Sequence, residues 1–213
     1  MMQCTEEYLI SGERSRRLHI LCACPRSNFQ AYPPAWDPPP KAAMEAREFI
    51  HVRLHERAHG LKHQPGDVCL PGGRVEEGES PKDAVVREIC EELKVSSNQI
   101  EIVGACDIYL TGKGGAIYPF VVRLDGYENS FSRDEVEEVF RVPVEYFKLN
   151  KPEEIFVTAK ETPGDDFPFE RIYGGKEYPW REYRRRIVFY QYEKWTIWGM
   201  TGKIVEAFAQ IFL

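Results

Sequence analysis

Residues 73–95 read GRVEEGESPKDAVVREICEELKV. Within this stretch, Ser80 followed by Pro81 is typical of a helix start, because serine caps free amide groups and proline fits the first helical position. Asp83 falls in the first turn, where the helix dipole favours a negative charge. The pattern predicts a helix over Pro81–Leu93, preceded by a polar loop.

The predicted helix carries three glutamates, Glu88, Glu91 and Glu92, at positions i, i+3 and i+4. This spacing places all three carboxylates on one face, where they repel one another. A bound cation would offset the repulsion, and oxygen ligands suit a hard divalent ion such as Mg²⁺ or Mn²⁺. A solvated acidic face would show the same spacing, so the three glutamates alone do not decide between the two interpretations.

The complete string resembles the Nudix box, whose fixed residues are a glycine, a glutamate, an arginine–glutamate pair, a glutamate pair and two aliphatic positions. The residues that fall in register are Gly73, Glu79, Arg87, Glu88, Ile89, Glu91, Glu92 and Val95. The one departure is Lys94, where the family has glycine. This position ends the helix, so the change affects the turn, where a left-handed conformation suits lysine less well, and leaves the carboxylates in place.

The resemblance implies an α/β fold, the Nudix α/β/α sandwich with a central mixed sheet. It also implies an enzyme, a Mg²⁺- or Mn²⁺-dependent pyrophosphatase. Glu88, Glu91 and Glu92, with the Gly73 carbonyl, would hold the metal. A pair formed by Glu79 and Arg87 would fix the loop against the helix. Water would attack phosphorus while the metal offsets charge on the diphosphate. The carboxylate that acts as base stays open.

Residues 57–73, RAHGLKHQPGDVCLPGG, are similar to the segment that precedes the box in coenzyme A pyrophosphatases, roughly R-S-x-x-L-R-x-H-x-G-Q-x-x-F-P-G-G. The matching residues are Arg57, Leu61, Gly66, Pro71, Gly72 and Gly73. The departures are Ala58, Lys62, Gln64, Asp67 and Leu70, and they weaken the substrate assignment more than the family assignment.

Downstream segments resemble the same enzymes, namely the stretch that begins at Pro119, residues 134–143 and residues 197–201, so the resemblance covers residues 56–213. It implies hydrolysis of coenzyme A or acyl-coenzyme A to 3′,5′-ADP and (acyl-)phosphopantetheine. The alternatives are a Nudix pyrophosphatase for ADP-ribose or a dinucleotide polyphosphate, and a non-catalytic nucleotide-sensing module.

Several further charged residues have two interpretations each. Glu135 is a candidate general base or second-metal ligand, or a solvated loop acid. Arg57 and Lys62 are candidates for contacts with substrate phosphates, or for surface salt bridges. A basic cluster would pair with the 3′-phosphate of coenzyme A or line a solvated strand edge; it comprises Arg181, Arg184, Arg185 and Arg186.

Charge and composition limit the partners. The net charge of −6 argues against broad binding to nucleic-acid backbones, and no apolar run approaches the ~20 residues that span a bilayer. The six scattered cysteines contain no C-x-x-C pair, which favours reduced thiols in a cytoplasmic protein without structural zinc. The expected partner is a small-molecule nucleotide substrate, with no nucleic acid and no membrane, and a homodimer stays open.

The sequence predicts an irregular N-terminal segment over residues 1–47 and the Nudix domain over residues 48–213. Residues 33–41, PPAWDPPPK, contain five prolines and exclude a helix interior or a central strand. Residues 14–47 fit poorly with the apolar strands expected before the box. They represent either a genuine extension or a reading-frame error that recovers near His55, and translation of the other two frames would decide.

Hydrophobic periodicity predicts the remaining elements. Strands are expected at residues 18–22, 48–54, 68–70, Ile100–Ala105, Ala116–Leu124, 137–143 and 186–192. A long loop is expected at residues 159–181, and a closing helix at residues 196–213.

Overall fold

The computed structural model describes residues 17–25, 51–111 and 115–211. Its strands are β1 (Arg17–Pro25), β2 (His51–Arg57), β3 (Val68–Cys69), β4 (Arg74–Val75), β5 (Ile100–Ala105), β6 (Tyr109–Leu110), β7 (Ala116–Leu124), β8 (Val136–Pro143), β9 (Glu153–Lys160), β10 (Glu182–Tyr192) and β11 (Trp195–Trp198). Its helices are α2 (Pro81–Leu93), α3 (Val144–Leu149) and α4 (Gly199–Ile211), with short 3₁₀ turns at Ser97–Gln99, Phe169–Arg171 and Gly175–Glu177. The proline-rich stretch at 33–41, the first residues of the strand predicted at 48–54 and the end of the helix predicted at 196–213 lie outside the described residues.

Helix α2 has the predicted bounds. The Ser80 hydroxyl accepts a hydrogen bond from the Asp83 amide at 3.2 Å, and the Asp83 carboxylate accepts one from the Ser80 amide at 3.4 Å. This reciprocal capping box satisfies amide groups that the first turn leaves free. The inner face of α2 is fully buried through Ala84, Val85, Ile89 and Leu93. The capping hydrogen bonds fix the first turn of this helix, and the packing of its inner face fixes its position against the core.

The C-cap of α2 is Lys94, whose backbone is left-handed at φ 52° and ψ 45°. A side chain with a Cβ atom is strained there, by about 1 kcal/mol or more. We expect Lys94→Gly to stabilise the protein by about 1 kcal/mol, which raises the melting temperature by about 2–4 °C in a protein of this size. Thermal unfolding followed by circular dichroism measures the change. Lys94→Ala is the control, because alanine keeps the Cβ atom, and an equal gain in that variant would contradict the explanation.

The largest sheet has the strand order β4-β1-β7-β5, with β6 added to β7. The pairs with β7 are antiparallel, whereas β1 and β4 run parallel, so this sheet is mixed, as expected. Strand β1 is longer than the strand predicted at 18–22, and it lies between β4 and β7. The N-terminal segment, residues 1–47, was expected to be irregular, yet it supplies an interior strand of this sheet. The domain boundary proposed at residue 47 stays a prediction.

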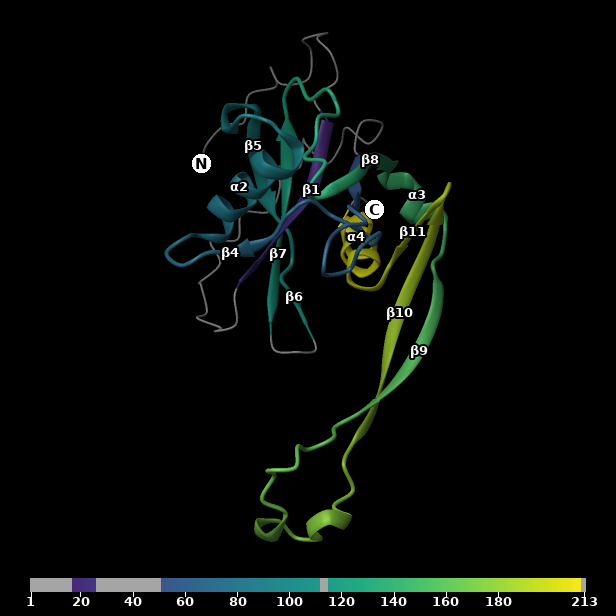
Figure 1. Cartoon of the computed structure of the whole chain (residues 1–213). Coiled ribbons are helices and arrows are strands. Elements are labelled where there is room, and N and C mark those ends of the chain that lie inside the picture. The colour runs from purple at the N-terminus through teal and green to yellow at the C-terminus, as the bar shows by residue number, and fades with distance from the viewer. Residues whose placement is uncertain (1–16, 26–50, 112–114, 212–213) are drawn as a thin grey trace, which may run out of the picture.

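Strand β7 is buried on both faces. Phe120, Val122 and Leu124 pack in the same core as α2, whereas Ile117 and Val121 belong to a second core that includes α4. Figure 1 shows the resulting layers, with α2 on one side of β1 and β7 and α4 on the other. The α/β class is confirmed.

The strands form three sheets, so the single central sheet expected from the sequence is wrong in this respect. Strand β2 pairs with β3 on one edge and with β8 on the other, which leaves no edge to join β4-β1-β7-β5. The third sheet is β11-β10-β9. Strand β2 is also buried on both faces, because Val52, Arg53, Leu54 and His55 are each at most 3% exposed. The strand predicted at residues 48–54 is therefore present over its described part, and both of its faces are buried.

The chain closes with strand β11 followed by α4, so the helix predicted from residue 196 starts too early. Trp195 and Ile197 are buried in alternation with exposed neighbours, and β11 pairs with the end of β10. Gly199, with φ 62°, then turns the chain into α4. A glycine suits this positive φ because it lacks a Cβ atom.

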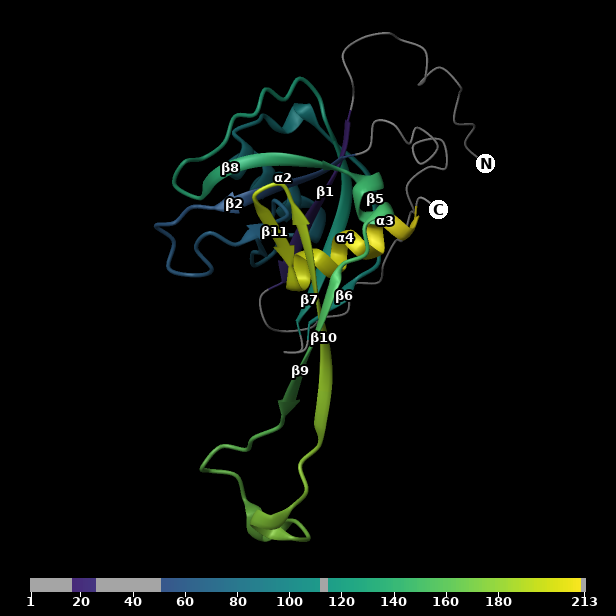
Figure 2. The ribbon, with the colours of Figure 1, turned by 90° about the vertical axis from the view of Figure 1, so that its right-hand side faces the viewer.

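The loop predicted at 159–181 is shorter than expected, because β9 extends to Lys160. Strands β9 and β10 form a hairpin that projects from the domain (Figures 1 and 2). We call residues 154–188 the arm. At its tip, Phe167 contacts Phe169 and Trp180 edge-on, with ring centroids 5.0 and 5.3 Å apart. These contacts keep the tip folded far from the main cores.

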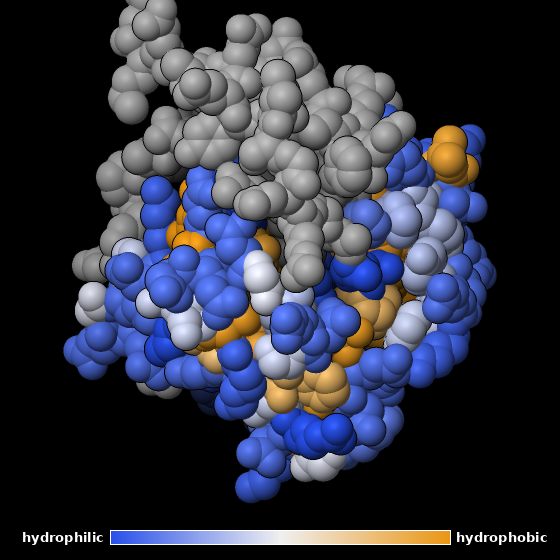
Figure 3. Space-filling model, turned by 90° about the horizontal axis from the view of Figure 1, so that it is seen from above, coloured by the Kyte–Doolittle hydropathy of each residue, from blue (hydrophilic) through white to orange (hydrophobic). Residues whose placement is uncertain are grey.

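Viewed from the end opposite the arm, the visible described residues are mostly hydrophilic, with smaller hydrophobic areas between them (Figure 3). Among the described residues, no helix has the length and apolar character needed to cross a membrane.

Candidate carboxylate site

The acidic face of α2 contains carboxylates in different environments. The side chains of Glu88 and Glu92 are 14% and 4% exposed, whereas that of Glu91 is 51% exposed. Spacing on the helix brings the three together, as predicted. The packing of the preceding loop then buries Glu88 and Glu92 and leaves Glu91 toward solvent.

Arg87 connects this face to the preceding loop. Its Nε donates to Glu79 Oε1 at 2.9 Å and its Nη2 donates to Glu79 Oε2 at 3.1 Å, which makes a two-pronged pair. Nη2 also donates to the Arg74 carbonyl at 2.8 Å, and Nη1 donates to Glu88 Oε1 at 2.9 Å and to Glu91 Oε2 at 3.4 Å. The guanidinium lowers the pKa of Glu79. Arg87 therefore fixes the loop and shares one positive charge among three glutamates, Glu79, Glu88 and Glu91.

If the protein has the activity that the resemblance implies, we expect Arg87→Lys to lower turnover by about 10- to 100-fold, because an ammonium group cannot form the two-pronged contact that orients the loop. Steady-state kinetics at saturating metal measures the loss. Lys82→Arg is a control on the exposed side of the same helix and should have normal turnover. Normal turnover in Arg87→Lys would show that catalysis does not require the two-pronged contact between Arg87 and Glu79.

Glu92 lies deepest. Its Oε2 accepts a hydrogen bond from the Gly72 amide at 2.9 Å. Burial, followed by the nearby Glu88 and Glu135 carboxylates, raises the pKa of Glu92 to about 8. Burial also raises the pKa of Glu88, to which Glu91 and Glu135 contribute. The site is thus a group of acids in which an added positive charge would be stabilised.

Gly73 makes close contact with this group. A Cβ atom built on Gly73 would lie 2.1 Å from Glu88 Oε1 and 2.3 Å from Glu88 Cδ. Real Cβ atoms do not approach other atoms so closely, so glycine at this position is required for the Glu88 carboxylate to lie against the loop backbone.

The loop before β8 brings Glu135 to the acidic face. The Ser132 amide donates to the Glu92 carbonyl at 2.7 Å, and the Ala58 amide donates to the Glu135 carbonyl at 2.9 Å. These bonds fasten the loop to the end of α2 and to the end of β2. Glu135 influences the pKa of both Glu88 and Glu92, so the structure brings this candidate together with the helix glutamates.

Arg57 and Lys62 are the two residues predicted to contact substrate phosphates. Of these two, only Arg57 lies close enough to the carboxylates to influence the pKa of one of them. The strand register shifts between Glu56 and Arg57, and such bulges re-aim a side chain. Arg57 acts on the pKa of Glu92 and of Cys69, and its buried Nε has no hydrogen-bond partner. Lys62 is exposed on the turn between β2 and β3.

The sequence interpretation missed His55 and Cys69. His55 Nε2 lies 3.0 Å from Cys69 Sγ and 3.9 Å from Glu92 Oε1, and His55 is fully buried. Burial, with help from Arg57, lowers the pKa of His55 to about 3, so the ring is neutral. The two residues face each other across the β2–β3 ladder. A prediction of a β-hairpin with its turn at residues 58–67 would have placed these two residues opposite each other.

A comparison with family models finds the NUDIX domain over residues 43–161, which is 119 of the chain's 213 residues. The chain belongs to the Nudix hydrolase family. The glutamates, Arg87 and Gly73, which contact one another in the structure, are therefore residues of a Nudix box.

The Nudix chain is similar to proteins named as coenzyme A diphosphatases. It is 36% identical over 100 residues to the peroxisomal coenzyme A diphosphatase NUDT7 of Mus musculus, covering 46% of this chain and 42% of the relative. It is 29% identical over 139 residues to the peroxisomal coenzyme A diphosphatase ndx-8 of Caenorhabditis elegans, covering 63% and 57%. The Nudix hydrolase NudL of Escherichia coli O7:K1 matches at 26% over 162 residues, covering 73% and 72%. The chain spans about half the length of the two diphosphatases.

The Nudix carboxylates have the chemistry of a site for a divalent metal. The donors are hard oxygens, the acids raise one another's pKa, and Gly73 leaves room that a Cβ atom would fill. As the side chains lie, the described residues contain no group of His, Cys, Asp or Glu already converged on one point. The reason is that Glu88 and Glu91 turn toward Arg87. Metal binding therefore requires these two side chains to turn.

We expect Mg²⁺ or Mn²⁺ to stabilise the Nudix domain against unfolding, by about 2.7 kcal/mol when the ion is present at 100 times its dissociation constant. Thermal unfolding in a metal series, with a chelated reference, measures the shift. Glu92→Gln should abolish most of it, whereas Glu101→Gln, on β5, should keep it. An identical shift in both variants would place the ion elsewhere.

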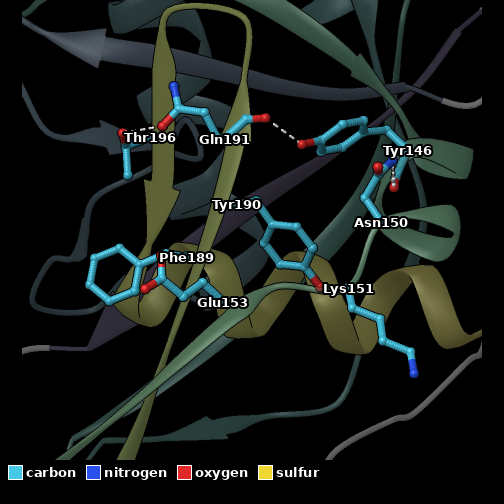
Figure 4. Close-up of a pocket in the computed structure, with 8 residues that line it drawn as sticks. All are labelled: Tyr146, Asn150, Lys151, Glu153, Phe189, Tyr190, Gln191 and Thr196. Atoms are coloured by element: carbon cyan, nitrogen blue, oxygen red, sulfur yellow. Dashed lines mark hydrogen bonds between the residues drawn. The ribbon is translucent and has the colours of Figure 1, made fainter.

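Two other features lie away from these carboxylates. The basic cluster is in the arm, with Arg181 just before β10 and the other three arginines on β10, and Figure 1 shows the arm extending away from α2. Arg186 there is paired with Glu206 and Glu154. The structure thus does not bring the cluster to the glutamates. A pocket of about 340 Å³ lies at the root of the arm, lined by Tyr146, Lys151 and Tyr190 among others (Figure 4).

Proposed function

We propose that this protein hydrolyses the diphosphate bond of a nucleotide derivative with the help of Mg²⁺ or Mn²⁺. The observation that carries the proposal is the buried Glu92 with Glu88 and Glu135 close by, next to Gly73, whose missing Cβ atom leaves room for the Glu88 carboxylate. Such a group of acids is costly without a cation, and a cation bound there offers a place for the diphosphate oxygens.

The reaction is a displacement at phosphorus. A water molecule attacks one phosphorus atom, a P–O bond of the anhydride breaks, and the departing phosphate takes the bonding electron pair. The proton of the water goes to a carboxylate, for which Glu91 and Glu135 are the candidates. A bound divalent metal supplies positive charge to the diphosphate oxygens. Arg87 and Glu79 hold the loop and the helix in register.

We propose coenzyme A or an acyl-coenzyme A as the substrate, with 3′,5′-ADP and (acyl-)phosphopantetheine as products. The support is the similarity to two proteins named as coenzyme A diphosphatases, together with the residues shared in segment 57–73. Arg57 supports a phosphate contact, because it lies by the carboxylates with a buried, unpaired Nε. Lys62 is exposed near the same turn and is proposed as a second phosphate contact.

The experiment is incubation with Mg²⁺ or Mn²⁺ and a panel that contains coenzyme A, acetyl-coenzyme A, ADP-ribose and diadenosine polyphosphates. Products are separated by chromatography and identified by mass. We expect 3′,5′-ADP from the first two substrates, in amounts that match the phosphopantetheine product. A higher kcat/KM for ADP-ribose or a dinucleotide would replace the coenzyme A assignment.

The sensing alternative predicts binding without turnover. Calorimetric binding of coenzyme A with no product from any substrate, in the presence of metal, would support it and refute the enzymatic proposal. The Glu92→Gln variant serves as the matched inactive protein, since it preserves side-chain shape. A cytoplasmic location also stays a proposal, and microscopy of the tagged full chain would compare it with the peroxisome named in two relatives.

A further inference from the structure

We propose that the arm is a self-association surface, on which the edge of β9 pairs antiparallel with β9 of a second copy of this chain. The observation that carries the inference is a strand edge without a partner among the described residues. When two copies of this edge pair antiparallel, the acidic residue of one copy can lie opposite the basic residue of the other. This inference concerns the arm and does not depend on the proposed function.

The arm is a sheet with too few strands. Residues Glu182 to Val188 of β10 pair with residues Lys160 to Glu154 of β9, while β11 pairs only with the root of β10, from Phe189 onward. Within the part of the chain that the structure describes, β9 is an edge strand over this whole length. Two-stranded ribbons are marginal in water, and three or more strands are needed for independent stability. A second β9 would convert the arm into a four-stranded sheet.

The edge also exposes apolar side chains. Ile155 and Phe156 are 43% and 48% exposed, and Tyr183 across the ladder is 51% exposed. Ile155, Val157 and Ala159 share one face of β9, because alternate residues point the same way. Edge strands of this kind are templates for pairing with another chain unless charges or bulges prevent it.

Symmetry limits the register. When two identical strands pair antiparallel in one sheet about a two-fold axis, one residue lies opposite its own copy. With Val157 at the axis, residues 154–160 pair with residues 160–154 of the second copy, which is the two-stranded length of the arm. Ile155 then lies opposite Ala159, and Glu154 lies opposite Lys160. With Phe156 at the axis instead, Lys160 would lie opposite Pro152, with no opposite charge to meet.

Both charged partners are available for this pairing. Lys160 Nζ lies 3.7 Å from Glu182 Oε1 in an exposed pair, and such pairs contribute little to stability. Glu154 accepts a bond from Arg186, but Arg186 also donates to both oxygens of Glu206, so its charge stays balanced when Glu154 turns outward. Charge complementarity therefore favours a second copy over an unrelated extended peptide as the occupant.

The test is sedimentation velocity of the full chain over about 1 µM to 1 mM, because an interface of this size is small and its occupancy should depend on concentration. We expect a monomer–dimer equilibrium. Val157→Lys should abolish the dimer, since two ammonium groups would face each other at the axis. Tyr173→Lys, at a fully exposed position in the arm tip, should leave it intact. A monomer at every concentration in the unmodified protein would overturn the proposal.

A charge exchange tests the register. Lys160→Glu should weaken dimerisation by about tenfold or more, because two like-charge pairs replace two opposite-charge pairs. The double variant Glu154→Lys with Lys160→Glu should restore it, although neither change restores the pair with Glu182 inside the chain. A double variant as weak as Lys160→Glu would overturn the Val157-centred pairing. Fluorescence of Trp180 at the arm tip checks that each variant keeps the arm folded.

Discussion

Glu92→Gln is expected to reduce turnover by about 100-fold or more while the fold is retained. The substitution removes the negative charge that the deepest carboxylate would offer to a bound cation, but it keeps the side-chain shape and an oxygen that accepts the Gly72 amide. Glu91→Gln should also reduce turnover strongly, since Glu91 is a proposed metal ligand and candidate base, exposed to the solvent that supplies the attacking water. Steady-state kinetics over a metal series measures both effects.

Circular dichroism and thermal unfolding establish that each glutamine variant is folded. The control is Glu145→Gln on α3, a carboxylate outside the site, which should turn over normally. Near-normal turnover of Glu92→Gln with Mg²⁺ would refute its ligand role. If only Glu91→Gln retained activity, Glu135 would become the leading candidate for the base.

Gly73→Ala is expected to lower turnover by about 100-fold, although it adds a single methyl group. The new Cβ atom would lie 2.1 Å from the present position of Glu88 Oε1, so it would narrow the space between loop and helix in which Glu88 turns toward a cation, and a shift of about 1 Å in a reacting group costs this much. The inner face of α2 is not involved, so the melting temperature should change far less than the activity.

Gly60→Ala, in the turn between β2 and β3, is the matched glycine control. A Cβ atom at Gly60 meets nothing within 4 Å, and its backbone does not need a positive φ. That variant should keep normal turnover. Equal activity of the two alanine variants would mean that Glu88 does not need the space beside Gly73.

The arrangement of the helix residues in the candidate site was predictable from the sequence because these contacts are local, whereas the functional roles of the residues stay predictions. Glu88, Glu91 and Glu92 share a helix face by spacing alone, and the Ser80 cap and Pro81 fixed the start of that helix. The Arg87–Glu79 pair, implied by family resemblance, is present in the structure. The contact between His55 and Cys69 was not predictable in this way, because it depends on the hairpin that brings β2 beside β3.

The fold was predictable for elements with clear periodicity and less so for those set by distant partners. Strands β5 and β7 have the expected bounds, since their apolar residues fit buried strands. Strands β9 and β11 were missed because their pairing is with β10, and no local pattern encodes that choice. The division into three sheets has the same origin, since it depends on which edges β2 uses.

The contacts of Arg87 have a consequence for how the protein responds to scarcity of magnesium. Its guanidinium already serves as a resident counter-ion for Glu88 and Glu91, so the helix does not rely on a captured ion to stay folded. Where a divalent ion binds as proposed, its uptake exchanges one positive partner for another. Because the Arg87 contacts are given up in that exchange, the affinity for the ion should be lower than the carboxylates alone would provide.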